Sequence, residues 1–308
     1  MSYLEEVNAD MLQEFLYFIN ERHSIFERRL SDTPFYLWTE DSVLKKARFC
    51  NVFRMLDRGS QISIDYMNRI SSGSYSELDE LTFAFAYRKT NNKAGWSEAI
   101  SILGIPDHSN ISDWVVEATS IGIELKDQGP YHVCCGVPKG ETIISALSKQ
   151  LSSRLKDGSF DRVIEQKTFD DKIDAMLRFE RVGRFTAQQI LTDYGYGRSG
   201  NKQCENDGVV AGPGSLRGLS LLFDFRKTIG DTSSDMIKEL RSYVVSLENH
   251  PALSVGRFTH DPSYMDIQNC LCEFDKYVRF KRGGRPKRGY KETSIKPIED
   301  IKIPISWQ

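Results

Sequence analysis

The segment 51–61 carries polar residues of the types and spacing that phosphate binding requires. On a helix, Asn51, Arg54, Arg58 and Gln61 would follow one another at steps of three, four and three residues and share one face, with Asp57 at its flank. Guanidinium groups bind phosphate oxygens through two parallel hydrogen bonds. The arginine pair therefore predicts a phosphate or pyrophosphate site, although an ordinary ion-pair network around Asp57 accounts for the spacing equally well.

A second group lies on 181–193, where Gly183 and Arg184 open a predicted helix. The first N–H groups of a helix have no partner within it and attract phosphate. Gln188, Gln189 and Asp193 follow along this helix, and Gln189 and Asp193 are spaced so that their side chains can hydrogen-bond. The pattern V-G-x-x-T-A at 182–187 resembles the hairpin of the helix-hairpin-helix DNA glycosylases, although it also occurs by chance at many helix starts.

In that superfamily, a catalytic aspartate follows the hairpin by a little over twenty residues. Here Asp207 follows Gly183 by 24 residues, and a second glycine-containing turn with Gly212, Gly214 and Arg217 comes next. The resemblance makes Asp207 a candidate catalytic carboxylate and the glycine turns candidate phosphate contacts. The simpler interpretations are an aspartate in a turn and a loop that leads into a helix.

The third group is a polar stripe on a predicted helix near the C-terminus. Asp266, Asn269, Glu273 and Lys276 recur at steps of three, four and three residues, beside a separate apolar stripe. A carboxylate next to an ammonium on a helix is often a surface pair worth well under about 1 kcal/mol. In a cleft, the same two groups could act as an acid and a base.

Basic residues are concentrated in 276–291, which contain eight Lys/Arg and no Asp/Glu. Without these eight, the chain has 33 basic and 43 acidic residues. A basic segment on an acidic body predicts contact with a polyanion at one place. We expect Arg285, Lys287 and Arg288 to form an extended arm that contacts phosphates; a solvated tail is the alternative.

The composition excludes several classes of protein. The 308 residues are 40% apolar and 27% charged, which is typical of a globular protein. No run approaches 18 apolar residues and the first ten residues are polar, so we expect a cytoplasmic protein with no transmembrane span, no secretory signal and no membrane partner. Six cysteines without C-x-x-C and five histidines without H-E-x-x-H predict reduced thiols and no dedicated transition-metal site.

The elements that must position these groups are predicted to be mainly helices. Apolar periodicity marks a first helix over 12–26 that ends before Pro34, and a second that is capped by Thr39, Asp41 or Ser42 and continues through Leu56. Further helices are predicted over 76–88, 93–103, 110–121, 141–156, 169–180, 185–195, 214–229, 233–248 and 264–280. We expect a loop or short hairpin at 129–140, irregular structure at 196–213 and an extended tail after Gly283. This predicts a mainly α fold, with a helical catalytic domain over 1–282 that has room for two lobes, and a basic, proline-containing tail over 283–308.

As an ordered set, these motifs resemble the phage thymine-hypermodification proteins called alpha-glutamyl/putrescinyl thymine pyrophosphorylases, or amino acid:DNA transferases. The resemblance runs from about residue 15 to about residue 290. The motifs that carry it are Glu21-Arg22-His23, Trp38-Thr39-Glu40-Asp41, Arg48-Phe-x-Asn51-Val-Phe-Arg54-x-x-Asp57-Arg58, Phe185-x-Ala187-x-Gln189-Ile, Gly212-Pro-Gly214-x-x-Arg217-Gly218 and Cys272-Glu273-Phe-Asp275-Lys276-Tyr. The family shares a helical domain with the phage 5-hydroxymethyluracil DNA kinases, but these 308 residues contain no G-x-x-x-x-G-K-S/T loop for ATP. Ser42-Val43 and Gly59-Ser60 depart from the family pattern, which bears on the subfamily more than on the class.

The resemblance implies an enzyme of phage-infected cells that acts on double-stranded DNA. In its substrate, the 5-hydroxymethyl oxygen of hydroxymethyluracil carries a pyrophosphate, and an amino acid or a polyamine replaces that group on a flipped base. We expect a fold like that of the helix-hairpin-helix DNA glycosylases. The expected roles are pyrophosphate binding by Arg54, Arg58 and Lys276; a base among Asp207, Asp57 and Glu273, with Asp207 favoured; base or amine contacts by Asn51, Gln188, Gln189, Asp193 and Asn269; and DNA-phosphate contacts by Gly183, Arg184, Gly212, Gly214, Arg217, Arg285, Lys287 and Arg288.

Two other functions fit the same fold. In a DNA glycosylase, Asp207 would stabilise an oxocarbenium ion at C1′ of a modified pyrimidine nucleotide, and a non-catalytic protein would only bind the modified duplex. The sequence establishes neither the donated amine nor any cofactor, and carboxylates near the site could bind Mg²⁺ without a recognisable motif.

Overall fold

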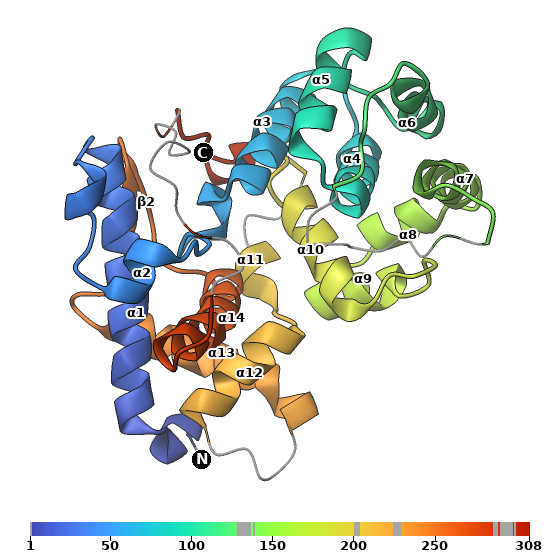
Figure 1. Ribbon diagram of the computed structural model, residues 1–308. Coiled ribbons are helices and arrows are strands. Elements are labelled where there is room, and N and C mark those ends of the chain that lie inside the picture. The colour runs from blue at the N-terminus through green and yellow to red at the C-terminus, as the bar shows by residue number, and fades with distance from the viewer. Residues whose placement is uncertain are drawn as a thin grey trace. The chain divides into compact units, whose positions relative to one another are not determined.

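The structure is a computed structural model that describes residues 2–127, 137, 139–199, 204–223, 229–285, 289, 298 and 300–308. It is mainly helical, and one two-stranded antiparallel sheet lies among the described residues (Figure 1). The chain divides into two compact units. Unit 1 comprises Met1–Asp57 and Val209–Ile301, and unit 2 comprises Arg58–Gly208 and Lys302–Gln308. No helix in the described ranges is both long enough and apolar enough to cross a membrane.

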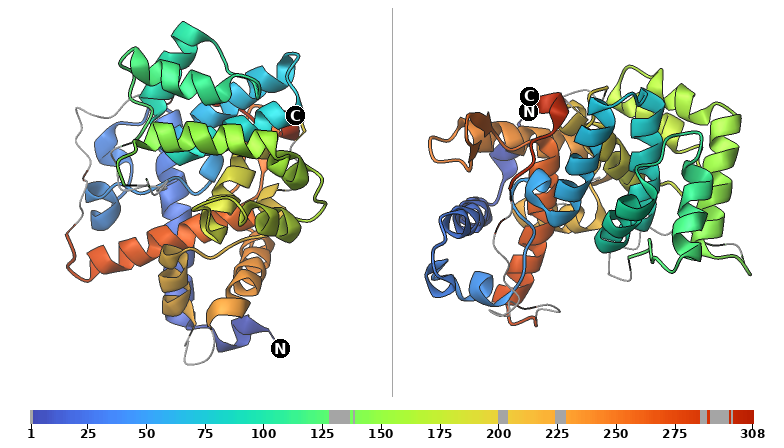
Figure 2. Two further views of the ribbon diagram at one scale, coloured as in Figure 1. Left: turned by 90° about the vertical axis from the view of Figure 1, so that its right-hand side faces the viewer. Right: turned by 90° about the horizontal axis from the view of Figure 1, so that it is seen from above.

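Unit 1 is built around its last long helix. Its elements are η1 (Tyr3–Glu6), α1 (Ala9–Leu30), η2 (Phe35–Leu37), α2 (Ser42–Lys46), η3 (Arg54–Leu56), α12 (Pro213–Leu222), α13 (Ile229–Ser246), β1 (Leu253–Val255), β2 (Phe258–His260) and α14 (Tyr264–Lys281). A capping box between Ser263 and Asp266 starts α14. Its buried face contributes Phe274 and Tyr277 to an aromatic cluster with Phe15 and Phe18 of α1. α14 also packs against α2, α12 and α13, and α12 lies beside it in all views (Figure 2).

Unit 2 contains the helices of the middle of the chain. They are α3 (Arg58–Ser72), α4 (Glu77–Thr90), α5 (Lys93–Leu103), α6 (Ile111–Ser120), α7 (Ile143–Lys156), α8 (Ser159–Ile164), α9 (Phe169–Met176), α10 (Arg184–Tyr194) and α11 (Cys204–Asp207), followed at the C-terminus by η5 (Ile305–Trp307). α4 is buried on nearly every side, and its Phe83 and Tyr87 rings pack edge-on against Trp96 of α5. α10 packs against α4 and α9.

Most predicted helices are present with small changes at their ends. The helix predicted over 93–103 is α5, and that over 264–280 is α14 with one more residue. The helix predicted over 169–180 ends at Met176, that over 214–229 ends at Leu222, and α11 lies within the stretch predicted to be irregular. Of the predicted loop over 129–140, only residues 137, 139 and 140 are described, and most of the predicted arm, including Lys287 and Arg288, lies outside the described residues.

The helix predicted from Thr39 through Leu56 is wrong. Asp41 caps α2 through the amides of Val43 and Leu44, but α2 ends at Lys46, and only the single turn η3 precedes α3. Asn51, Arg54 and Arg58 therefore do not share one helix face. The physical reason is that side chains from elsewhere in unit 1 bind the backbone groups of 49–54, which outweighs the local preference for helix.

Candidate functional site

The irregular segment 48–57 is held on one side by Arg22 of α1. The Arg22 side chain is buried, at 3% exposure. Its Nε donates to the carbonyl of Cys50 at 2.9 Å, and its Nη2 donates to the carbonyl of Phe49 at 3.2 Å and to Asn51 Oδ1 at 2.8 Å. One guanidinium therefore fixes three consecutive residues, 49–51, that belong to no helix.

The polar stripe of α14 holds the other side of the segment. Glu273 Oε2 accepts from the amide of Cys50 at 3.0 Å, and Asp266 Oδ1 accepts from the amide of Arg54 at 2.6 Å. Asn269 Nδ2 donates to the carbonyl of Asn51 at 3.4 Å. The stripe predicted from the sequence thus faces segment 48–57, and its carboxylates bind backbone N–H groups there.

Several predicted site residues meet in this part of unit 1. Asn51 donates from its backbone to Asp57 Oδ1 at 3.0 Å and from its side chain to the carbonyl of Leu56 at 2.9 Å. Lys276 Nζ lies 3.1 Å from Glu273 Oε2, donates to the carbonyl of Arg48, and sits 4.5 Å from the centre of the Phe49 ring. The side chain of Arg54 is buried, at 5% exposure.

Cys270 of α14 lies among the charged groups of this region. Burial raises the pKa of the Cys270 thiol, and the negative charges of Asp266, Glu273 and Asp57 raise it further, whereas Arg22 lowers it. Cys270 is therefore an un-ionised thiol at neutral pH.

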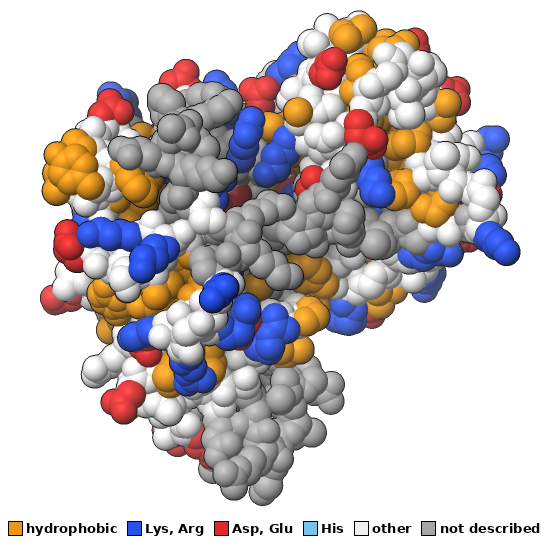
Figure 3. All heavy atoms as spheres, in the orientation of Figure 1, with side chains coloured by type: hydrophobic (Ala, Val, Ile, Leu, Met, Phe, Trp, Pro, Cys, Tyr) orange, Lys and Arg blue, Asp and Glu red, His pale blue; other side chains and the backbone are white. Residues whose placement is uncertain are grey.

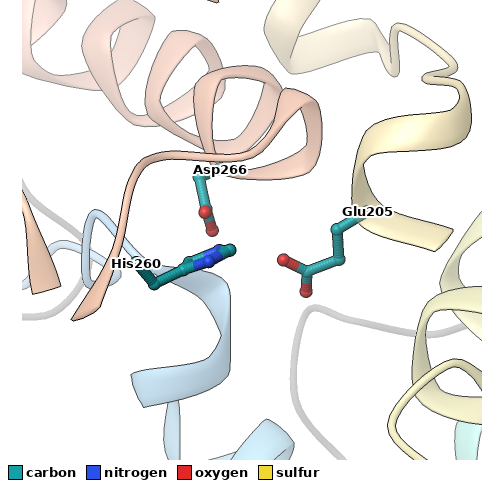
Figure 4. Close-up of side chains that lie close together, drawn as sticks. All are labelled: Glu205, His260 and Asp266. Atoms are coloured by element: carbon teal, nitrogen blue, oxygen red, sulfur yellow. The ribbon is translucent and has the colours of Figure 1, made fainter. Parts of the chain in front are cut away.

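Asp266 also lies near His260, the last residue of strand β2. Figure 4 shows its carboxylate pointing toward the His260 ring, and the nearest ligand atoms of these two residues lie within 4.8 Å. The carboxylate already accepts from the amide and hydroxyl of Ser263, each at 2.8 Å, and from the amide of Arg54. Histidine and carboxylate are ligand types that divalent cations accept, but within unit 1 this pair supplies fewer donors than a structural zinc site uses.

In unit 2, Asp207 ends the short helix α11. The ring of Phe169 fills the space where a side chain at Gly208 would lie, which fixes the chain next to Asp207 against the start of α9. Partial loss of solvation raises the pKa of Asp207, and the ammonium of Lys172, one turn along α9, opposes the rise. Lys172 Nζ donates to the carbonyls of Val163 and Ile164, each at 3.3 Å.

Two backbone features mark the turn before α10. Arg181 adopts a left-handed backbone conformation with φ 58°, and Gly183 caps α10 with no side-chain hydrogen bond. Arg184, which begins the helix, pairs with Asp174 at 3.2 Å and Asp170 at 3.6 Å on α9. Because no side-chain hydrogen bond caps this helix start, its first amides can donate to an anion.

Further along α10, the predicted substrate contacts are largely inside unit 2. Gln188 is buried and Gln189 is half-buried. Asp193 is fully buried, and Arg88 of α4 donates to its two oxygens at 2.7 and 2.6 Å. This ion pair fixes α10 on α4. Arg88 and Asp193 are 105 residues apart in the sequence, so the spacing of residues could not predict their contact.

The predicted phosphate contacts of 212–218 have a packing role in unit 1. A Cβ at Gly214 would overlap the sulfur of Cys272, and one at Gly218 would overlap the carbonyl of Leu271, so both glycines allow α12 to lie directly on α14. Gly212 caps α12 and is buried. Arg217 points from α12 to Asp275 of α14, with Nε 3.0 Å from Oδ2. Arg285 is exposed.

The predicted site residues therefore belong to two different units. Asn51, Arg54, Asp57, Asn269, Glu273 and Lys276 belong to unit 1, together with Gly212, Gly214, Arg217 and Arg285, whereas Arg58, Gly183, Arg184, Gln188, Gln189, Asp193 and Asp207 belong to unit 2. The sequence analysis gave no role to Arg22, whose only signal was its place in a motif of the resemblance.

Comparison with known proteins identifies the family. The family model described as 5-hmdU DNA kinase, helical domain, matches residues 9–284. No curated protein and no solved structure matches the chain. The matched span covers most of unit 1 and nearly all of unit 2, including segment 48–57, α10, α11 and α14. The chain belongs to the 5-hmdU DNA kinase helical-domain family.

Proposed function

We propose that the protein is a DNA base-modifying transferase. Its substrate is DNA in which hydroxymethyluracil carries a pyrophosphate on its 5-hydroxymethyl oxygen. The C–O bond breaks and pyrophosphate leaves with the electron pair. An amine nitrogen then forms a C–N bond to the methylene carbon and gives up a proton. The observation that carries the proposal is the family match over residues 9–284, which associates the chain with DNA that contains 5-hydroxymethyldeoxyuridine.

In unit 1, we assign the departing pyrophosphate to Arg54 and Lys276. A polyanionic leaving group needs cationic donors that are in place before the bond breaks. Segment 48–57, which contains Arg54, is bound on both sides by Arg22, Glu273 and Asp266 through hydrogen bonds of 2.6–3.2 Å. Such support is what a preorganised binding site requires, and we assign Asn51 and Asn269 to hold the uracil edge or the amine.

In unit 2, we assign the base to Asp207. A general base works best when its pKa approaches the working pH, and partial desolvation moves the pKa of Asp207 upward. Glu273 is a weaker candidate, because its Oε2 already accepts from the Cys50 amide at 3.0 Å and from the Lys276 ammonium at 3.1 Å. We assign Arg58 to the leaving group as well, and Gln188 and Gln189 to substrate contacts; Asp193 acts through its support of α10.

The DNA backbone is proposed to meet the turn before α10, through Gly183 and Arg184, in the manner of the helix-hairpin-helix DNA glycosylases. The left-handed Arg181 and the uncapped start of α10 support this assignment. The partners are then double-stranded modified DNA and an amino acid or polyamine, in the cytoplasm of a phage-infected cell.

The test is a reaction of the full chain with DNA that contains pyrophosphorylated hydroxymethyluracil. Candidate amino acids and polyamines are added with and without Mg²⁺, and the nucleosides are analysed by mass spectrometry while released pyrophosphate is measured. An amine-modified thymidine with equal release of pyrophosphate supports the proposal. Free base with abasic sites would identify a glycosylase, phosphorylated nucleoside formed from ATP would identify a kinase, and binding without any product would identify a non-catalytic protein.

Two variants test the assignments. Asp207→Asn should lower the rate of transfer by about 100-fold or more, because general-base catalysis contributes about that much. A rate within about tenfold of wild type would remove Asp207 from the role of base. Arg54→Ala and Arg58→Ala should each slow the release of pyrophosphate, and normal turnover of both variants would place the leaving-group site elsewhere.

A further inference from the structure

One surface of unit 1 carries a dense group of cationic side chains. They extend from α12 onto the C-terminal half of α14, where Figure 3 shows Lys and Arg side chains gathered over both helices. The side chains of Arg217 and Arg279 are 58% and 56% exposed. Arg282, at the end of α14, is also exposed.

The glycines of α12 create this arrangement. Gly214 and Gly218 allow α12 to touch the backbone of α14, so Arg217, which lies between them, stands next to Asp275. A larger residue at either glycine would separate the helices and move the guanidinium of Arg217 away. The packing of the two helices and the position of the arginine are thus linked.

Asp275 holds two arginines at once. Its Oδ2 accepts from Arg217 Nε at 3.0 Å and from Arg279 Nε at 3.3 Å, and only 8% of its side chain is exposed. One buried carboxylate between two exposed guanidinium groups leaves the cluster with a net positive charge. It also restricts the rotamers of two long side chains, which would otherwise lose that freedom when they bind a ligand.

The number of acids per cation distinguishes this cluster from the ion pairs around it. Lys281 pairs with Glu14 of α1 at 2.6 Å, and Lys276 pairs with Glu273, so each of these cations has its own acid. Arg217 and Arg279 instead share one acid.

We propose that Arg217, Arg279 and Arg282, with Asp275 as the residue that positions the first two, form a surface that binds the phosphates of one DNA strand. We call it the Asp275 surface, and it rests on the proposed function to the extent that DNA is the partner. Arg217 lies beside Asp275, and from Asp275 to Arg282 the helix rises by roughly 10 Å. This exceeds the size of one phosphate group and favours successive phosphates of a polymer over a single small anion. Bidentate guanidinium groups suit phosphodiester oxygens.

The experiment measures binding of the full chain to a fluorescein-labelled duplex that contains hydroxymethyluracil, by anisotropy at a series of salt concentrations. Each phosphate contact contributes about 0.9 to the slope of log K against log salt. We expect Arg217→Ala and Arg279→Ala each to lower the slope by about that amount, and the double variant to lower it by about twice as much. Lys238→Ala on α13, which removes a positive charge of unit 1 whose side chain is 40% exposed, is the control and should leave the slope unchanged.

Asp275→Asn tests the positioning role, because it makes the chain more positive while it loosens the two arginines. We expect weaker binding than in the wild type, and tighter binding would overturn that role. Equal slopes for the wild type, both arginine variants and Lys238→Ala would overturn the surface itself. Arg217→Lys and Arg279→Lys keep the charge and should retain most of the slope, which guards against loss of folding in the alanine variants. Because these measurements need no turnover, the surface can be confirmed even if no amine transfer is found, and it can fail while transfer is observed.

Discussion

Replacement of Arg22 by methionine should release segment 48–57 from unit 1. The change removes three hydrogen bonds of 2.8–3.2 Å that the Arg22 guanidinium donates. The carbonyls of Phe49 and Cys50 and the Asn51 side chain then lose this donor. A buried acceptor that loses its donor costs about 1–3 kcal/mol. Among the described residues, Arg22 Nη1 is buried with no hydrogen-bond partner. Methionine relieves that desolvation cost, so we take the lower end, about 1 kcal/mol for each of the three acceptors and about 3 kcal/mol together.

Hydrogen exchange followed by mass spectrometry measures this release directly. The amides of Cys50, Asn51 and Arg54 bind carboxylates in the wild type, and a local loss of about 3 kcal/mol should speed their exchange by roughly 100-fold. Arg241→Met is the matched control, because Arg241 Nε binds the carbonyl of Pro262 at 2.8 Å in the same unit but on another loop. Exchange at 50–54 that stays at the wild-type rate in Arg22→Met, or that rises equally in Arg241→Met, would refute the role of Arg22.

Three further outcomes follow from the contacts. Asp193→Ala leaves the largely buried side chain of Arg88 without its carboxylate. It should lower the stability of unit 2 by about 3–5 kcal/mol, as measured by urea unfolding. A loss below about 1 kcal/mol would show that the pair is screened as at a surface. Lys172→Met removes the charge that opposes the raised pKa of Asp207. The base must be ionised, so the acid limb of the pH–rate profile should move to higher pH, and it should stay in place in Lys172→Arg; an unmoved limb in Lys172→Met would disconnect the two groups. Gly218→Ala would force α12 away from α14 and should destabilise unit 1 by about 1–3 kcal/mol, which thermal unfolding would show; a stability equal to wild type would mean that the helices can separate without cost.

The pH dependence of stability near Asp207 has a definite sign. Its pKa is raised in the folded state, so the folded chain binds this proton more tightly than the unfolded chain does. Stability therefore falls as the pH rises from the ordinary range of an aspartate through the raised pKa, which is opposite to the effect of a salt-bridged acid. Asp207→Asn should remove that pH-dependent loss.

Local sequence signals predicted most of the helices, although α3 and α8 were not predicted. α5 and α14 were predicted nearly to the residue because their signals are local: Asn92 and Ser263 cap their starts, and Gly104 follows the end of α5. Segment 48–57 was predicted as a helix because its apolar spacing fits one, and the Arg22 and Glu273 side chains that override that spacing come from distant parts of the chain. The sequence likewise could not show that a distant arginine binds Asp193, since residues 105 positions apart carry no common period.

The carboxylates of α14 and Asp207 lie in different surroundings. Asp266 and Glu273 accept hydrogen bonds from backbone amides of segment 48–57, so these carboxylate oxygens already have a positioning role. Asp207 is partly desolvated, and this raises its pKa. When several acids in one protein are available for a proton transfer, the acid whose ionised form is least stabilised is the strongest base. This physical difference, which the spacing of residues could not reveal, is the reason that we favour Asp207 over the acids of segment 48–57 and α14.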